Sequence, residues 1–154
     1  MRADEPESEK ERSDRQLMEL LNEVRVALPG AQVLLAFLFT VPFATRFGRI
    51  THTQRVAFLV CVLCTVAGTV LLMAPSVYHR LRWEQGGKAD VIRVAHRLFL
   101  AGTAFLALGI VAAVFMVDDV LFGTPAAVAS AAGTALAVLL IWYALPLMRQ
   151  RHPR

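Results

Sequence analysis

Residues Ser76–Arg97 read SVYHRLRWEQGGKADVIRVAHR and divide the chain into two halves. This stretch carries five of the sixteen Lys and Arg residues, two of the four His residues and one of the two Trp residues. Two long apolar runs precede it and two follow it. Because so polar a segment is costly to place in hydrocarbon, we interpret it as the central cytoplasmic loop of a chain that crosses a membrane four times.

The apolar runs are long enough to span a bilayer. Four runs contain no Asp, Glu, Lys, Arg or His, namely residues 26–45, 56–78, 98–117 and 120–148. A transmembrane helix needs roughly 20 apolar residues to cross about 30 Å of hydrocarbon. The chain is 56% hydrophobic with a mean hydropathy of +0.54, which is unlike a soluble domain. We predict an all-α integral membrane four-helix bundle with spans at about residues 29–45, 56–75, 98–117 and 125–148.

The segment before the first span is amphipathic. Ser13 and Gln16 have the spacing of a capping box, in which each side chain bonds a backbone N–H at a helix start. Leucines then recur at helical spacing up to Leu28, and Pro29-Gly30 follows. We predict an interfacial amphipathic helix that lies in the headgroup layer, with a bend where Pro29 begins the first span.

These patterns divide the chain into four parts. The charged N-terminal residues have too little apolar surface to fold and are predicted to be disordered. The predicted parts are residues 1–12 as the disordered tail, 13–28 as the amphipathic helix, 29–148 as the membrane domain and 149–154 as a basic tail.

The distribution of basic residues predicts the orientation. Thirteen Lys and Arg residues lie in segments 1–25, 76–97 and 149–154, whereas loop 46–55 has three and turn 120–124 has none. Because cytoplasmic loops carry the excess of Lys and Arg, we predict a multi-pass protein of the cell (inner) membrane with both termini cytoplasmic. We also expect contacts with membrane lipids, including anionic headgroups. No nucleic-acid partner is expected, because no basic face with interleaved aromatic residues lies outside these short segments.

Small residues recur at helical spacing in the last three spans, and such residues let membrane helices approach closely. The strongest of these signals is the small-residue ridge of the fourth span, Ala129, Gly133 and Ala137. It predicts packing with a second copy of the chain or with a larger membrane complex. The full set of predicted helix-packing residues is Gly68, Gly102, Gly109, Ala129, Gly133 and Ala137.

A candidate cytoplasmic-face cluster gathers around two His-Arg pairs, one ending the second span and one beginning the third. Imidazoles titrate near neutral pH and bind transition metals, so a pH sensor or metal site with a Glu partner is one interpretation. The other is that the arginines contact lipid phosphates and the histidines lie among the headgroups; two histidines 17 residues apart match no known ligand spacing, so no metal site is predicted. The cluster comprises Glu19, Glu23, Arg25, His79, Arg80, Arg93, His96 and Arg97.

The middle of every span lacks Asp, Glu, Lys, Arg and His, which argues against an ion-coupled transporter. Cys61 and Cys64 have the C-x-x-C spacing, but their position within an apolar run favours a packing role over a redox one. We therefore expect no catalytic residue and no cofactor. The leading hypothesis is a non-enzymatic accessory or structural membrane protein.

Two other hypotheses come from different classes. One is a small oligomeric channel or uncoupled transporter lined by Gln32, Thr65, Thr69, Ser130 and Thr134. The other is an enzyme that acts on lipid headgroups at the cytoplasmic face, with His79, His96 and Glu23 as its titratable groups.

Two segments carry a resemblance to a known family. They are NEVRVALPGAQVLLAFLFTVPF (Asn22–Phe43) and, within Ala74–Arg97, APSVYHRLRW and GGKADVIRVAHR. With the patterns N-E-x-R-x-x-L-P-G and P-x-x-x-H-R, they resemble an uncharacterised family of small four-span membrane proteins of bacteria, of the actinobacterial kind. The resemblance covers most of residues 14–148. It implies the four-span topology, but no activity; members often have Asn at the place of His96, which disfavours a paired-histidine metal site.

Overall fold

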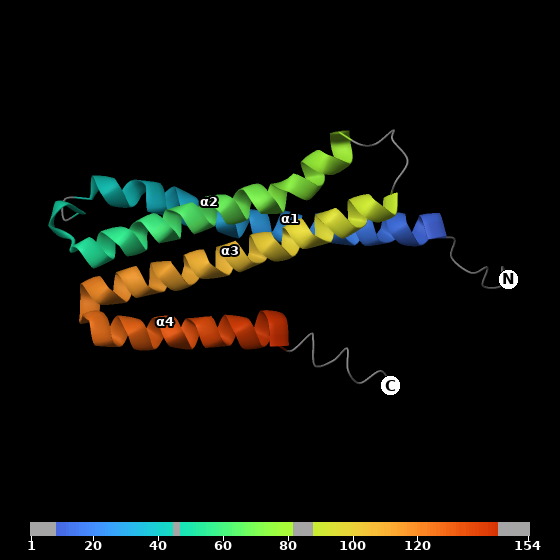
Figure 1. The fold of residues 1–154 in the computed structure, drawn as a ribbon. Coiled ribbons are helices and arrows are strands. Elements are labelled where there is room, and N and C mark those ends of the chain that lie inside the picture. Colours follow the sequence, from blue (N-terminus) through green and yellow to red (C-terminus); the bar gives the residue numbers. More distant parts are fainter. Residues whose placement is uncertain (1–8, 45–46, 82–87, 145–154) are drawn as a thin grey trace.

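The structure is a computed structural model that describes residues 9–44, 47–81 and 88–144. Those residues form four long α-helices and no strand (Figure 1). The helices are α1 (Glu9–Thr40), α2 (His52–Leu81), α3 (Lys88–Phe122) and α4 (Thr124–Val138). Two 3₁₀ turns, η1 (Val41–Phe43) and η2 (Phe47–Arg49), lie between α1 and α2, and the π-helical segment η3 (Leu139–Ala144) continues α4.

All four helices are long and apolar enough to cross a membrane. The candidate spans are Leu21–Phe43, His52–Val77, Arg93–Phe122 and Thr124–Ala144, and each overlaps one of the predicted ranges. The prediction of an all-α fold with four membrane-spanning helices is therefore confirmed. The architecture is compatible with a multi-pass integral membrane protein.

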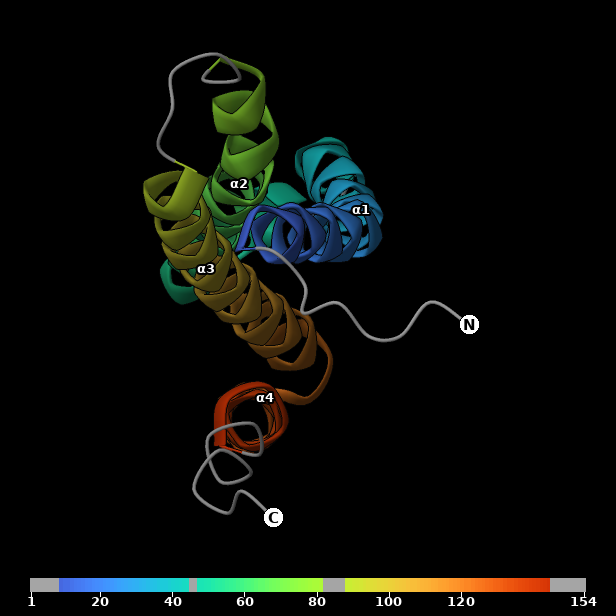
Figure 2. The ribbon, with the colours of Figure 1, turned by 90° about the vertical axis from the view of Figure 1, so that its right-hand side faces the viewer.

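The helices are arranged as a group of three with α4 at its edge. The antiparallel pair α2–α3 makes the most extensive contact, and α1 packs against both members of the pair. Within the described residues, the body of α4 packs against α3 alone and lies apart from α1 and α2 (Figures 1 and 2). As a result, 33% of an 18-residue stretch of the α2 span is buried inside the protein, but only 6% of a stretch of equal length in the α4 span.

The core lies where the first three helices meet. Its buried members are Ala31 of α1, Leu72 of α2 and Leu106 of α3. Partly buried apolar side chains pack against these three, including Leu34 and Phe99. Gln32, one of the residues considered for a pore lining, is exposed, because its neighbour Ala31 occupies the position that faces the core.

The first helix is continuous through Pro29, so it unites the predicted amphipathic segment with the first span. It begins at Glu9 rather than at Ser13. The ribbon of α1 changes direction along its length (Figure 2), as expected for a helix with an internal proline. A location of residues 13–28 in the headgroup layer remains a prediction.

Two other helix boundaries differ from those expected. Pro75, expected to end the second span, is buried inside α2, which continues to Leu81; a membrane helix tolerates an internal proline where neighbouring groups compensate for the missing bond. Asp118 and Asp119 do not close α3, which continues to Phe122. The turn is made by Gly123, whose φ of 85° is easily adopted only without a Cβ.

Candidate functional site

The closest helix contact is a seam between α2 and α3 that is lined by glycines. A Cβ atom added to Gly68 would lie 3.0 Å from the backbone oxygen of Gly102 and 3.0 Å from the backbone nitrogen of Leu106. A Cβ added to Gly109 would lie 2.7 Å from Thr65 Oγ1. Three of the predicted helix-packing residues, Gly68, Gly102 and Gly109, thus lie where two backbones are in direct contact.

Polar atoms in this seam bond to backbone carbonyl groups. The Cys61 thiol lies 3.2 Å from the carbonyl oxygen of Gly109 on the facing helix. The hydroxyl of Thr65 donates to the Cys61 carbonyl at 2.8 Å, and that of Thr69 donates to the Thr65 carbonyl at 2.7 Å. Cys61 and Cys64 are free thiols, and both are buried. The arrangement matches a packing role, with Thr65 fully buried between the helices.

The small-residue ridge of α4 has the opposite environment. Ala129, Gly133 and Ala137 are all exposed, and no atom lies within 4 Å of a Cβ added to Gly133. The side of α4 that packs against α3 carries the buried Ala127. At the helix end, Tyr143 Oη lies 3.5 Å from Thr103 Oγ1 of α3. The ridge therefore faces away from the other described helices.

The hydroxyl groups considered for a pore do not meet around a common axis. Thr65 and Thr69 lie in the seam, whereas Ser130 and Thr134 lie on α4 and donate to carbonyls of their own helix, those of Ala127 and Ser130. The α4 helix packs on α3 and not on α2. A single copy therefore does not line a channel with this set.

The candidate cytoplasmic-face cluster is drawn from α1, α2 and α3. Its described side chains are exposed, and they are Glu19, Glu23, Arg25, Arg93, His96 and Arg97. His79 and Arg80 lie on the last turns of α2, but their side chains fall outside the described residues, and so does any contact between His79 and His96. In the described part of the chain, no group of three or more His, Cys, Asp or Glu residues could hold a metal ion.

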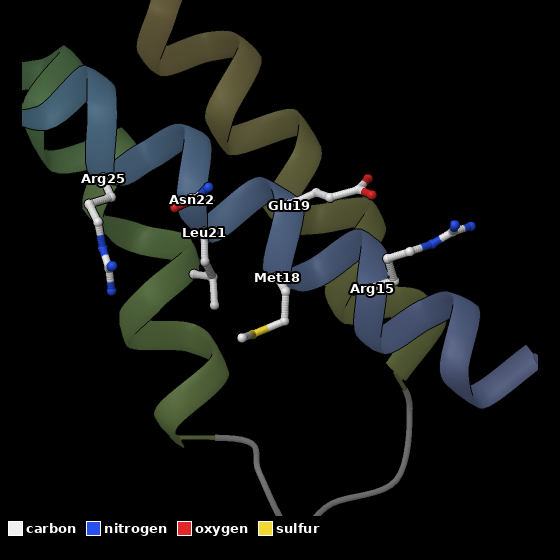
Figure 3. Close-up of a pocket in the computed structure, with 6 residues that line it drawn as sticks. All are labelled: Arg15, Met18, Glu19, Leu21, Asn22 and Arg25. Atoms are coloured by element: carbon white, nitrogen blue, oxygen red, sulfur yellow. The ribbon is translucent and has the colours of Figure 1, made fainter.

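A groove of about 420 Å³ opens beside the N-terminal half of α1. Its described lining comprises Arg15, Met18, Glu19, Leu21, Asn22 and Arg25 (Figure 3). Glu19 and Arg25 belong to the predicted cluster, and Asn22 begins the N-E-x-R-x-x-L-P-G pattern, whereas Arg15, Met18 and Leu21 belong to neither. Met18 lies between Leu17 and Glu19 in the sequence, and only the structure shows that its side chain is 69% exposed.

A polar network at the start of α2 was also not foreseen. The backbone N–H of Thr51 donates to Gln54 Oε1 at 3.0 Å, and the N–H of Gln54 donates to Thr51 Oγ1 at 3.2 Å, which is a capping box. Gln54 Nε2 also donates to Asp119 Oδ2 of α3 at 2.9 Å. We call Thr51, Gln54 and Asp119 the Gln54 network. The T-x-x-Q spacing signals the cap, but no local pattern signals the partner on α3.

The second carboxylate oxygen of Asp119, Oδ1, is buried and has no hydrogen-bond partner among the described residues. An unsatisfied buried acceptor costs about 1–3 kcal/mol. The Gln54 network therefore fixes the contact between α2 and α3 at this end, at some energetic cost.

The family model described as a family of unknown function (DUF6328) matches residues 6–146. The chain belongs to this family. No curated protein and no solved structure matches the chain. The family covers all four helices, which agrees with the expected resemblance, and it assigns no activity to any of the groups described above.

Proposed function

We propose that this chain is a non-enzymatic accessory or structural protein of the cell (inner) membrane. In this proposal, the small-residue ridge of α4 packs against a second copy of the chain or against a larger membrane complex. The segments before the first span and after the fourth lie on the cytoplasmic side.

The exposed ridge carries this proposal. Gly68, Gly102 and Gly109 are each in close contact with a neighbouring helix, whereas Gly133 has open space around it. Close approach of backbones is how membrane helices associate in the absence of a hydrophobic driving force between them. A ridge of the same kind that is uncovered in one copy is a suitable surface for a second helix.

The orientation is supported by the positions of the helix ends. The spans begin or end on one side at Leu21, Val77, Arg93 and Ala144, and on the other side at Phe43, His52, Phe122 and Thr124. In the sequence, segments 1–25, 76–97 and 149–154 adjoin the span ends of the first side, and they contain thirteen of the sixteen basic residues. The excess of Lys and Arg favours the cytoplasm for that side.

The test is purification of the tagged protein from its native membrane in mild detergent, followed by mass spectrometry of the intact assemblies. We expect a homo-oligomer or a stoichiometric complex that is lost in Gly133→Ile. The matched control is Ala132→Ile, because Ala132 is also exposed but points about 100° away around the helix. Assemblies that survive Gly133→Ile, or that are lost equally in both variants, would overturn the proposal.

The orientation is tested separately with reporter fusions. A fluorescent protein that folds only in the cytoplasm, fused after Arg154, is expected to fluoresce. Alkaline phosphatase, which is active only outside the cytoplasm, is expected to be active when fused at Gly123. The reverse pattern would contradict the assigned orientation without bearing on assembly.

A further inference from the structure

We propose that the groove beside the N-terminal half of α1 binds the phosphate headgroup of an anionic phospholipid. The groove is independent of the α4 ridge, and its residues are not involved in the assembly proposed above. Its position, its side chains and the place of Arg25 within the first span carry the inference.

The groove lies at the level where the first span begins. Its described lining extends from Arg15 to Arg25, and the span begins between them at Leu21. The α3 span begins on the same side at Arg93, and Arg93, His96 and Arg97 are exposed there. In a bilayer this level corresponds to the headgroup layer, where phosphate groups are the abundant anions.

The directions of the side chains separate a lipid-binding side from a solvent side. Met18, Leu21 and Arg25 extend from one side of α1, whereas Arg15 and Glu19 extend from another (Figure 3). The acidic member of the described lining thus points away from Arg25. In a bilayer, acyl chains that cover Met18 and Leu21 would exclude water beside the guanidinium group and strengthen its interaction with an anion.

Arg25 is placed to bind an anion at this level. It lies within the first span, four residues beyond Leu21, and its side chain is exposed. An arginine at the edge of a span extends its guanidinium group toward the headgroups. A guanidinium group matches phosphate with two parallel hydrogen bonds, and the amide of Asn22 in the same lining offers a further donor.

The test uses the full chain in a non-ionic detergent and native mass spectrometry to count bound lipid. The probes are phosphatidylglycerol, phosphatidylcholine with the same acyl chains, and inorganic phosphate. We expect a preference for phosphatidylglycerol, and we expect Arg25→Gln to lower its affinity about fivefold. Arg49→Gln, an exposed arginine at the opposite end of the spans, is the matched control and is expected to keep the preference.

Each other outcome counts against the site. Equal loss in Arg25→Gln and Arg49→Gln would mean that binding follows overall charge, and no preference for the anionic lipid would remove the proposal. Displacement of phosphatidylglycerol by inorganic phosphate at equal concentration would assign the groove to free phosphate instead.

A second variant, Met18→Ser, leaves the buried core unchanged and is expected to weaken lipid binding without altering the thermal stability.

Discussion

Replacement of Gly109 by alanine tests whether the α2–α3 seam determines the fold. The new methyl group would lie 2.7 Å from Thr65 Oγ1 and 3.3 Å from the backbone nitrogen of Thr65. Thr65 is fully buried, and its hydroxyl is held by the bond to the Cys61 carbonyl. The clash is therefore relieved either by rotation of Thr65, which breaks that bond, or by separation of the two helices.

The expected magnitude follows from two opposing effects. Overpacking of a well-packed interior costs about 1–3 kcal/mol, whereas alanine is favoured over glycine within a helix by about 1 kcal/mol. We expect Gly109→Ala to lower the free energy of unfolding by about 1–2 kcal/mol, or the melting temperature by roughly 2–8 °C. Gly133→Ala meets no atom within 4 Å, so its stability should stay unchanged or rise.

The chain supplies its own reporter for this measurement. Cys61 and Cys64 are its two cysteines, and both are buried. A thiol-reactive fluorescent dye should therefore label the protein in detergent only as it unfolds. The melting temperatures of the two alanine variants can then be compared directly with that of the unaltered chain.

A double variant identifies the cause of the loss. Thr65→Ala removes the atom that the new methyl group would meet, so Gly109→Ala combined with Thr65→Ala should be less destabilised than the sum of the single variants. Two outcomes would refute the reasoning. One is an equal change for Gly109→Ala and Gly133→Ala, and the other is strict additivity with Thr65→Ala.

Three further predictions concern the Gln54 network and the turn after α3. Gln54→Ala removes the acceptor for the Thr51 N–H, which is one half of the capping box, and the bond to Asp119. It should lower the free energy of unfolding by about 1–3 kcal/mol in the same dye assay. Asp119→Asn keeps an acceptor for Gln54 and removes a partly buried charge, so its melting temperature should equal or exceed that of the unaltered chain; a loss as large as that of Gln54→Ala would show that the charge itself is needed. In Gly123→Ala the alanine must adopt a positive φ, so the free energy of unfolding should fall by about 1 kcal/mol. Gly30→Ala is the control: no atom lies near the new methyl group inside α1, so the free energy of unfolding should not fall.

Several boundaries could not be assigned from local pattern. Proline disfavours helical geometry in the residue before it, and aspartate is costly in hydrocarbon. The second and third spans were therefore predicted to end at about Pro75 and just before Asp118. Both lie inside helices in the structure. Asp119 remains helical while its side chain bonds Gln54 of α2, 65 residues earlier in the chain. This pairing depends on how α2 and α3 pack against each other. The sequence around either residue does not predict that packing.

The membrane-spanning architecture could be predicted from the sequence alone. It depends only on whether each apolar run is long enough to cross a hydrocarbon layer of fixed thickness. Which of the small residues contact a neighbouring helix was decided only by the tertiary structure. The ridge of Ala129, Gly133 and Ala137 has the most regular spacing, yet it is exposed, whereas the less regular glycines of α2 and α3 form the seam. Spacing places residues on one face of a helix, but which face meets a neighbour depends on how all four helices pack together.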